Sequence, residues 1–320
     1  FRSVKKQYES LLHNKCGGRI MELLSKYVEF KNGKKRPDSK GSIPVYGGNG
    51  ILDYTNVSNM NNGVVIGRVG VYCGSVFLVK DECWVSDNAI KAICYDNMDL
   101  SYLYYLLSSL HLNERRIGTS QPLLTQNILN NIEVDVPTLD TQKKIASVLE
   151  LLDEKIRLNN EINNNLEQQI EAALLSMLNS TQTNHVRLGD YLYIKGRIGW
   201  KGLKKDEYLD QSNFRIINGE SLTKAGVDWS KAGYISESRY VESPEIMLTE
   251  GDILLSKDGT IGKIGYIDSL TTPTTVASGI FVIRNIKPDI ISTTFIYYLL
   301  KSRLFEGFIA TRTEGSVIPH

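Results

Sequence analysis

Two basic segments are the part of this chain whose residue types and spacing point most directly to a chemistry. Each lies in glycine-bearing sequence that is typical of a loop. The first contains Lys31, Lys34, Lys35, Arg36 and Lys40, and the second contains Lys195, Arg197, Lys201, Lys204 and Lys205. Basic loops neutralise the phosphates of nucleic acids, and their side chains can also reach base edges in a groove. Either segment alone could be a solvated charge run, but its recurrence in both halves of the chain favours nucleic acid.

The charge of the chain is unevenly distributed. Lys and Arg number 37 against 36 Asp and Glu, so the 320 residues have a formal net charge of +1. Residues 1–45 hold 11 basic and 4 acidic side chains, a net charge of +7, and residues 181–205 hold 6 and 1, a net charge of +5. An acidic excess of 11 in the other residues offsets them. The near-neutral total excludes a polybasic protein of the histone kind and leaves two local basic patches.

Recognisable catalytic and metal-binding motifs are missing from the sequence. The cysteines are Cys16, Cys73, Cys83 and Cys94. They form no C-x-x-C pair, so we expect reduced, mostly buried thiols rather than a zinc site. The Gly-Lys within residues 259–264 lacks P-loop spacing. The stretch Asp153-Glu154-Lys155 superficially suits a nuclease, and we interpret it as a solvated helix face. Cys–His and Ser–His–Asp arrangements stay open on the sequence, but no motif points to one.

Composition and hydropathy suit a globular protein away from membranes. Hydrophobic residues make up 42% and charged residues 23% of the chain, which is ordinary for a folded domain. No apolar run approaches the ~20 residues of a membrane span, and the start has no signal-peptide core. We expect a cytoplasmic protein with at least two domains and no membrane partner.

A weak internal repeat organises the chain. Similar stretches recur in one order: LSKY (24–27) with LGDY (188–191), the runs from Gly63 and Gly251, VSDNAIKAI (85–93) with VASGIFVI (276–283), and YYLL (104–107) with YYLL (297–300). The offset grows from about 165 to about 193, which predicts an insertion of nearly thirty residues near 195–250. Each copy predicts short strands followed by a helix, at 102–110 and at 295–304. The predicted fold class is α+β, with two β-rich domains.

A long helix is predicted between the two copies, because residues 141–179 contain neither Gly nor Pro. Alternating steps of four and three residues give a mostly apolar series. The series is Ile145, Leu149, Leu152, Ile156, Asn159, Asn163, Leu166, Ile170, Ala173 and Met177. It predicts a coiled-coil seam against a partner helix, in which the two asparagines fix the register. The alternative is that the asparagines mark a break in the helix.

Candidate nucleic-acid contacts can be assigned by side-chain type. We expect phosphate contacts from Lys34, Lys35, Arg36, Lys40, Lys201, Lys204 and Lys205. Candidate base readers are Asn49, Arg68, Arg116, Ser120 and Gln121 in the first copy, and Arg197, Lys257, Arg312 and Ser316 in the second. Arg suits guanine and Asn or Gln suits adenine by bidentate geometry. A structural role is equally open for each, since Asn49 beside glycines can simply hold a turn.

Several loose motifs cover nearly the whole chain in a specific order. They are IPVYGGNGI (43–51), GVVIGR (63–68), GVYCGSV (70–76), GDILLS (251–256), GTIGK (259–263), GTSQP (118–122), GSVIPH (315–320) and the stretch from VPTL (136–139) to Asp153. Together they resemble the specificity (S) subunits of type I restriction–modification enzymes. The last stretch is similar to the entry of the spacer helix in that family.

The resemblance implies two target-recognition domains that each read one half of a split double-stranded DNA target. Long helices would pack antiparallel and hold these domains apart. It implies a non-catalytic subunit on which methyltransferase (M) subunits dock, with a restriction (R) subunit for cleavage. S-adenosylmethionine, ATP and Mg would then belong only to those partner subunits.

The same resemblance predicts the domain boundaries. They give a short N-terminal helix at 1–19, a first recognition domain at 20–139, a spacer helix at 140–180 and a second recognition domain at 181–320. The sequence stops where the family has a last strand and a second spacer helix. We expect either a truncated chain or a second copy of the chain that supplies the partner helix.

Two other functions stay open on the sequence. One is a coiled-coil scaffold with two β-rich heads, which would not bind DNA. The other is an enzyme with an unrecognised site, which would act without further subunits. The scaffold would show no salt-dependent DNA affinity. Binding to a random-sequence DNA pool, with and without a methyltransferase subunit, separates these functions.

Overall fold

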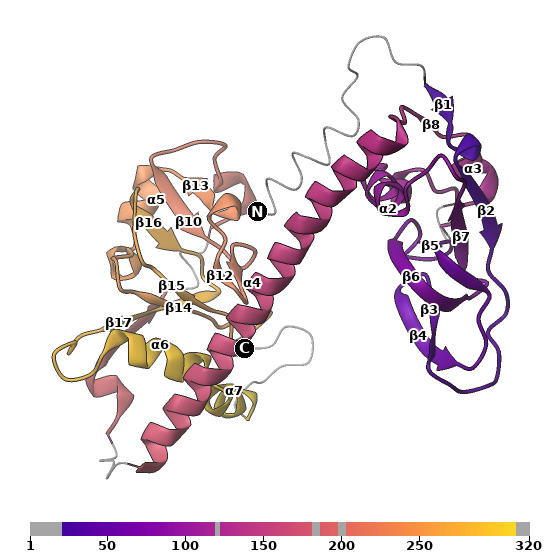
Figure 1. Cartoon of the computed structure of the whole chain (residues 1–320). Coiled ribbons are helices and arrows are strands. Elements are labelled where there is room, and N and C mark those ends of the chain that lie inside the picture. Colours follow the sequence, from indigo (N-terminus) through magenta and orange to yellow (C-terminus); the bar gives the residue numbers. More distant parts are fainter. Residues whose placement is uncertain (1–20, 119–121, 181–185, 198–202, 312–320) are drawn as a thin grey trace. The chain divides into compact units, whose positions relative to one another are not determined.

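The computed structural model of the chain describes residues 21–118, 122–180, 186–197 and 203–311. Its contacts divide the chain into two compact units, Phe1–Asn163 and Asn164–His320. Each unit has its own sheets (Figure 1). Each also has its own cluster of buried apolar residues. The α+β architecture predicted from the sequence is confirmed. The helix expected at 1–19 lies outside the described residues, and the predicted domain boundaries stay predictions.

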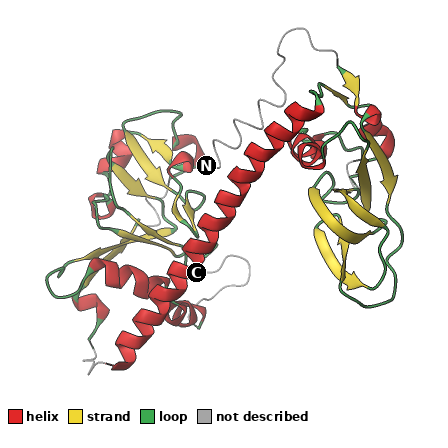
Figure 2. Cartoon of the chain, in the orientation of Figure 1, coloured by secondary structure: helices red, strands yellow, loops and turns green. Residues whose placement is uncertain are grey.

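A six-stranded mixed sheet forms the centre of the first unit (Figure 2). Its strands are β2 (Val28–Asn32), β3 (Ile43–Gly47), β4 (Gly50–Thr55), β5 (Met60–Gly67), β6 (Val76–Val85) and β7 (Ala89–Cys94). They lie in the order β2-β7-β5-β6-β3-β4, and every neighbouring pair is antiparallel except β3 with β6. A separate pair joins β1 (Glu22–Leu23) to β8 (Glu133–Val134).

The strand β5 is apolar on both faces because both faces of the sheet are covered. Val64, Val65 and Ile66 are all fully buried, although successive residues of a strand point to opposite sides. Val64 and Ile66 belong to the main core, and Val65 belongs to a smaller core with Val79 and Cys83. A strand buried on both faces is expected to show a continuous apolar run instead of an alternating one.

Helix α2 (Leu100–Ser109) contributes to the main core of the first unit. It begins after Asp99, whose carboxylate accepts a hydrogen bond from the Tyr102 backbone N–H at 2.9 Å. Leu103, Leu106 and Leu107 recur at helical spacing and are buried. The helix predicted at 102–110 is therefore confirmed. The short helix α3 (Gln126–Asn130) follows and begins after Thr125.

The second unit contains three small sheets and three short helices in the part of the chain that is described. Its strands are β9 (Leu192–Gly196), β10 (Phe214–Ile217), β11 (Leu222–Thr223), β12 (Gly226–Val227), β13 (Gly233–Ile235), β14 (Ile253–Ser256), β15 (Ile264–Tyr266), β16 (Thr274–Val276) and β17 (Ile280–Asn285). Its helices are α5 (Glu237–Val241), α6 (Thr293–Lys301) and α7 (Arg303–Ala310). The sheets have the orders β15-β14-β17-β9, β13-β10-β16 and β11-β12.

The single helix predicted at 295–304 is two helices in the structure. Ser302 separates them because its backbone is extended, with φ −73° and ψ 156°. Its hydroxyl accepts a hydrogen bond from the Phe305 N–H at 3.4 Å and so caps the start of α7. The residue type is common at such a position, but sequence spacing alone did not separate the two helices.

Hydrogen-bond register confirms the internal repeat. The antiparallel order β2-β7-β5-β6 of the first unit recurs in the second as β9-β17-β14-β15. A 3-10 turn precedes each first strand, at Leu24–Lys26 and at Leu188–Asp190. The tyrosine that follows each turn has nearly the same backbone angles, φ −118° and ψ −19° at Tyr27 against φ −119° and ψ −18° at Tyr191.

The register also locates the added residues of the second copy. The offset between equivalent residues is 164 at Leu24 and Leu188, and 189 at Gly67 and Ser256. The expected insertion near 195–250 therefore lies between β9 and β14, in a segment that includes β11, β12, β13 and α5. In addition, the counterpart of the ten-residue β6 is divided into β15 and β16.

Helix α4 (Leu139–Ser180) runs unbroken through Asn159 and Asn163, so the alternative of a helix break there is wrong. Gln142 attaches its first turn to the first unit. The Gln142 side chain is buried, and its Nε2 donates to the carbonyls of Asn97 at 3.0 Å and Pro137 at 2.9 Å. Glu150 accepts hydrogen bonds from Lys80 Nζ and Ser101 Oγ further along the helix.

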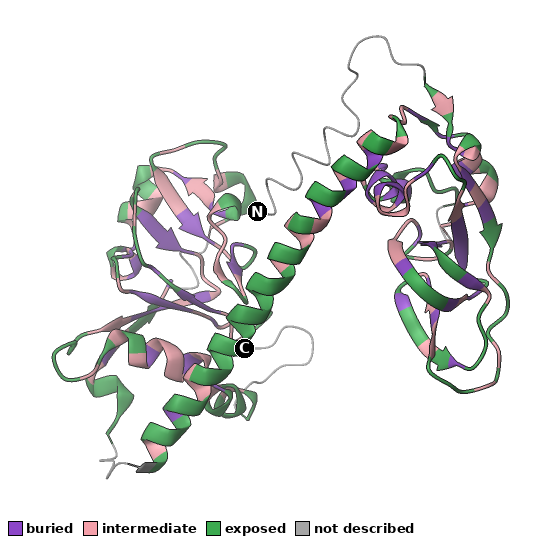
Figure 3. Cartoon of the chain, viewed as in Figure 1, coloured by how far each residue is buried: buried purple, intermediate pink, exposed green. Residues whose placement is uncertain are grey.

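The predicted seam residues of α4 do not share one environment. Leu149 is buried, and Ile145, Leu152, Ile156 and Ile170 are half-buried. The exposed members are Asn159, Asn163, Leu166, Ala173 and Met177. Exposed residues predominate along the middle of α4 (Figure 3). Ile145 packs on the main core of the first unit and Leu149 is buried, so neither is available to a partner helix. The seam at the other positions stays a prediction. A partner helix for the exposed apolar residues stays a prediction.

Within the described ranges, none of the helices combines the length and the apolar character needed to cross a membrane.

Candidate nucleic-acid interface

The turn between β6 and β7, Ser86–Asn88, is the point where several loops of the first unit meet. The backbone N–H of Lys34 donates to the Val85 carbonyl just before it at 3.0 Å, and the Arg68 N–H donates to the Asn88 carbonyl at 2.9 Å. The Ser86 N–H donates to Tyr46 O at 2.9 Å. This turn therefore holds the start of the basic loop, the β3 end and the β5–β6 loop close together.

Gly33 explains how the basic loop comes so near this turn. A Cβ atom at Gly33 would lie 1.9 Å from the Ser86 carbonyl oxygen, a distance that no side chain tolerates. The Gly33 N–H donates to the Ala89 carbonyl at 2.9 Å, which continues the pairing of β2 with β7. The glycine thus lets the loop leave the sheet edge directly beside the turn.

The cations of the basic loop divide into paired and unpaired groups. Arg36 forms an ion pair with Asp53, and Lys31 forms one with Glu29 at 2.8 Å. The side chains of Lys34, Lys35 and Lys40 are exposed and form no ion pair with any residue in the described ranges. Their charge is not neutralised by neighbouring carboxylates, which suits the predicted phosphate contacts.

The candidate base readers of the first unit lie on loops near the same turn. Arg68 donates from Nη1 to the Asp87 carbonyl at 3.2 Å, and its loop is joined to the β3–β4 turn by a hydrogen bond from Ser75 Oγ to Gly48 O. Asn49 lies within that β3–β4 turn. Burial raises the pKa of the Cys73 thiol, and the nearby charge of Arg116 opposes the shift. Asn49, Arg68 and Arg116 therefore occupy neighbouring loops.

The β5–β6 loop has a counterpart in the second unit. Lys257 occupies the place of Arg68, and its N–H donates to Gly279 O at 2.9 Å as the Arg68 N–H donates to Asn88 O. Both loops contain two glycines with positive φ, Gly70 and Gly74 in the first and Gly259 and Gly262 in the second. The Lys257 ammonium pairs with Asp258 at 2.9 Å and lies 5.7 Å from the Phe281 ring centroid. Its charge is therefore partly satisfied.

Arg197 is placed differently from its prediction as a base reader. Its side chain is 3% exposed, and its guanidinium donates to Val276 O at 3.1 Å, Ser243 Oγ at 3.3 Å and Thr275 Oγ1 at 3.4 Å. Burial lowers its pKa, and the charges of Glu242 and Glu245 oppose that shift. These contacts give Arg197 an internal role, which corrects the sequence interpretation.

The structure shows little of the remaining candidate DNA contacts. Lys204 and Lys205 are exposed at the start of a 3-10 turn, Lys205–Glu207, where Glu207 accepts from the Lys204 N–H at 2.7 Å. Five candidates, Ser120, Gln121, Lys201, Arg312 and Ser316, lie outside the described residues.

Two cations on strands, one in each unit, were missed by the sequence analysis. Lys91 on β7 is 7% exposed and donates to Asn59 O at 2.7 Å. Arg215 on β10 lies 5.6 Å from the Trp229 ring centroid and 5.2 Å from that of Tyr234. A lysine within the otherwise apolar strand AIKAIC is the signal that could have identified Lys91. Arg215 has no comparable signal.

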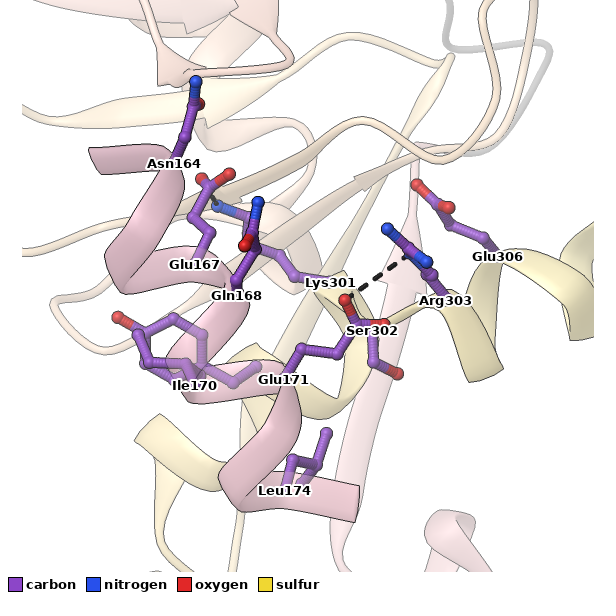
Figure 4. Close-up of a pocket in the computed structure, with 11 residues that line it drawn as sticks. Asn164, Glu167, Gln168, Ile170, Glu171, Leu174, Lys301, Ser302, Arg303 and Glu306 are labelled. Carbon is purple, nitrogen blue, oxygen red and sulfur yellow. Dashed lines mark hydrogen bonds and ion pairs between the residues drawn. The ribbon is translucent and has the colours of Figure 1, made fainter. Parts of the chain in front are cut away.

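A groove of 340 Å³ lies between the second half of α4 and the α6–α7 corner of the second unit (Figure 4). Its charged side chains are paired across the groove. Lys301 Nζ lies 3.2 Å from Glu167 Oε1, and Arg303 Nε lies 3.5 Å from Glu171 Oε2. These pairs favour a role in attaching α4 to the second unit over a role in ligand binding. No group of three or more metal-ligating side chains occurs in the described residues.

Comparisons with known proteins agree on one family. The family described as "Type I restriction modification DNA specificity domain" matches residues 20–168. The specificity subunit of type I restriction enzyme EcoprrI from Escherichia coli is 26% identical over 138 residues, 42% of this chain and 34% of that protein. The specificity subunit of type I restriction enzyme MjaVIII from Methanocaldococcus jannaschii is 25% identical over 278 residues, 78% of this chain and 63% of that protein.

A solved structure shares the fold. The crystal structure of the S subunit of a type I restriction–modification system from M. genitalium superimposes with a TM-score of 0.63. Sequence identity is 20%, and the match covers 93% of this chain and 80% of that one. By contrast, the chain spans only about a third to just under two thirds of the length of the two relatives above.

Proposed function

Because this chain belongs to the family of type I restriction–modification specificity subunits, we propose that it recognises DNA sequence for such an enzyme in the cytoplasm. Each unit reads one half of a bipartite double-stranded target. The chain itself performs no catalysis and holds no cofactor. Methylation with S-adenosylmethionine belongs to methyltransferase subunits, and ATP- and Mg-dependent cleavage belongs to a restriction subunit.

The gathering of loops at the Ser86–Asn88 turn is the observation that carries this proposal. Lys34 and Lys35 bring unpaired positive charge to the turn, and Arg68 brings a side chain that can read guanine. Phosphate contacts position a protein on the duplex, and base contacts specify the sequence. The first unit thus combines both kinds of group on neighbouring loops of a rigid sheet.

Helix α4 is the proposed spacer between the two half-sites. A helix of 42 residues is about 63 Å long at ~1.5 Å per residue. One turn of DNA measures about 35 Å, so this length corresponds to between one and two turns. That range suits a target with an unread gap between its halves. The exposed apolar residues of α4 would then pack on a partner helix, from a longer chain or from a second copy.

Selection from a random DNA pool tests the proposed function. The full chain, with and without a methyltransferase subunit, is incubated with the pool, and the bound DNA is sequenced after repeated rounds. We expect a bipartite motif and an affinity that falls with salt. Failure to enrich any motif in both conditions, together with no salt-dependent affinity, would overturn the proposal and favour a scaffold without DNA binding.

A further inference from the structure

We propose that Lys31, Lys34 and Lys91 form one anion site that holds a single backbone phosphate of the DNA bound by the first unit. The inference rests on the proposed function and adds a contact and a residue, Lys91, to it. It starts from the unusual position of Lys91. Buried lysines are rare unless they are paired with an acid, because burial disfavours the charged ammonium.

Lys91 has no acidic partner among the described residues. Its side chain lies on the central region of the sheet, where β7 is paired with β2 on one side and β5 on the other. The Asn59 carbonyl is the only hydrogen-bond partner of its ammonium in the described ranges. A neutral carbonyl leaves the positive charge uncompensated, so its field extends to nearby anions.

The neighbours of Lys91 are other cations. Lys31 is its register partner on β2, and Lys34 follows three residues later at the start of the basic loop. Burial lowers the pKa of Lys91, and the charges of Lys34 and Lys31 lower it further, which reflects their closeness. Lys31 and Lys34 are exposed, so they can meet a ligand from solvent while Lys91 adds charge from behind.

The second unit shows that the fold does not need a lysine at this position. By register, Lys31 corresponds to Lys195 and Lys91 corresponds to Val282, which is fully buried. In the second unit the charges of Glu242 and Glu245 raise the pKa of the buried Arg197 and so favour its charged form, although burial and Arg239 lower it. Lys91 has no such carboxylate among the described residues, only the Cys83 thiol, so its charge is better explained by an external anion than by the fold.

A phosphodiester is the anion that the surroundings favour. Lys34 belongs to the loop beside the Ser86–Asn88 turn, and the unpaired Lys35 lies next to it. A DNA strand that meets the loop would bring phosphates at regular spacing, and lysine contacts a phosphate oxygen as a point charge. The ion pair between Lys31 and Glu29 is exposed and yields readily to a phosphate.

The test compares Lys91→Met, Lys34→Met and the double variant in the full chain on the selected DNA. Each single variant should bind about tenfold more weakly at low salt, because Lys34→Met removes a charge-assisted hydrogen bond and Lys91→Met removes a poorly solvated positive charge beside it. Each should also flatten the slope of log affinity against log salt by about 0.9, the value of one phosphate. Because one phosphate is shared, the double variant should flatten it no further. The matched control Lys26→Met removes an exposed lysine that pairs with Glu22 and should change neither quantity.

The thermal stability of Lys91→Met distinguishes a phosphate-binding role of Lys91 from a role in stabilising the fold. Lys91→Met should leave the Tm unchanged or raise it, because a buried, uncompensated charge is replaced by an apolar side chain. If Lys91→Met does not fold, Lys34→Met in the exposed loop still decides the outcome. An unchanged salt slope in either single variant, or a doubled loss in the double variant, would overturn the single site. If the wild-type chain binds no DNA at all, the proposed function itself fails.

Discussion

The Tyr105 hydroxyl on α2 donates a 2.9 Å hydrogen bond to Asp153 Oδ2 on α4. Burial and this hydrogen bond to a carboxylate both raise the pKa of Tyr105, so it stays protonated and keeps donating. The preceding Tyr104 packs against the Tyr105 ring, with centroids 5.0 Å apart, but its hydroxyl bonds to no described residue. Two adjacent tyrosines on one helix therefore differ in one hydrogen bond.

This difference predicts unequal effects of two substitutions. Tyr105→Phe should lower the free energy of unfolding by about 0.5–1.5 kcal/mol, because it removes the bond to Asp153. Tyr104→Phe should change it by less than ~0.5 kcal/mol. Urea denaturation followed by circular dichroism measures both. Equal effects of the two variants would show that the hydrogen bond to α4 contributes nothing.

Neutralising the basic loop should reduce the salt dependence of DNA affinity. Changing Lys34, Lys35 and Arg36 together to Ala should flatten the slope of log affinity against log salt by about 0.9 for each phosphate released. Arg36 is already paired with Asp53, so we expect the two lysines to account for most of the change. Filter binding at several salt concentrations measures the slope, with Lys26→Ala as control. An unchanged slope would remove the loop from the interface.

Substitutions of Arg197 and of Lys204, an exposed lysine of the second unit, should have opposite effects on stability and on the salt dependence of DNA binding. Arg197→Met should destabilise the second unit by about 1–3 kcal/mol, because Ser243 and two further oxygens lose a buried donor. Lys204→Met should leave the Tm unchanged and reduce the salt slope, since Lys204 is exposed. Thermal unfolding and DNA titration on both variants check this. A stable Arg197→Met with weakened DNA binding would restore Arg197 as a reader.

Replacing Gly74 with alanine should cause a steric clash that the same replacement at Gly70 does not cause. Both glycines have positive φ, +89° and +74°. A Cβ at Gly74 would lie 2.5 Å from the Asn113 backbone nitrogen, whereas a Cβ at Gly70 would meet nothing within 4 Å. Gly70→Ala should cost only the ~1–2 kcal/mol of a left-handed alanine, and Gly74→Ala about 1–3 kcal/mol more. Equal midpoints in urea would contradict the close approach.

Cys83 is buried and Cys94 is half-buried, and we expect both thiols to be alkylated slowly. Burial raises the pKa of Cys83 to about 11 and that of Cys94 to about 12, so little thiolate exists at pH 8. Iodoacetamide at pH 8 should leave both unlabelled in the folded chain and label them in urea, as mass spectrometry can show. Because the folded pKa values are raised, their contribution to stability is present below about pH 8.5. It is lost progressively as the pH rises towards 11. Rapid labelling of the folded chain would contradict their burial.

Much of the fold could be predicted from the sequence because the two copies of the repeat share short local motifs. The Tyr-Tyr-Leu-Leu stretches indicated two helices, and the glycine-bearing runs marked equivalent loops. Ser302 could not be identified as a helix boundary, because a capping serine and an ordinary helical serine look alike in a sequence. The apolar series on α4 was typical of a coiled coil, but Ile145 packs on the core of the first unit, and such packing produces the same spacing.

The sequence predicted which segments of the candidate site carry positive charge, but it did not predict which of their side chains are buried. Lys34 and Lys35 are exposed, as a loop of polar residues predicts. Arg197 belongs to the same kind of basic segment, yet its guanidinium is enclosed by Ser243 and Thr275 from distant parts of the chain. Lys91 was missed because its importance depends on Lys31 and Lys34 across strands. Long-range pairing of this kind is not visible in local composition.

The division of β6 in the second unit has a kinetic consequence. In the first unit, Tyr46 pairs with Val85 in the parallel bridge between β3 and β6, which joins residues 39 positions apart. Its counterpart in the second unit pairs Ile217 with Val276, 59 positions apart. Longer loops must close before β10 and β16 meet, and chains with more distant contacts fold more slowly. The first unit should therefore reach its native sheet sooner than the second, both in refolding and during synthesis.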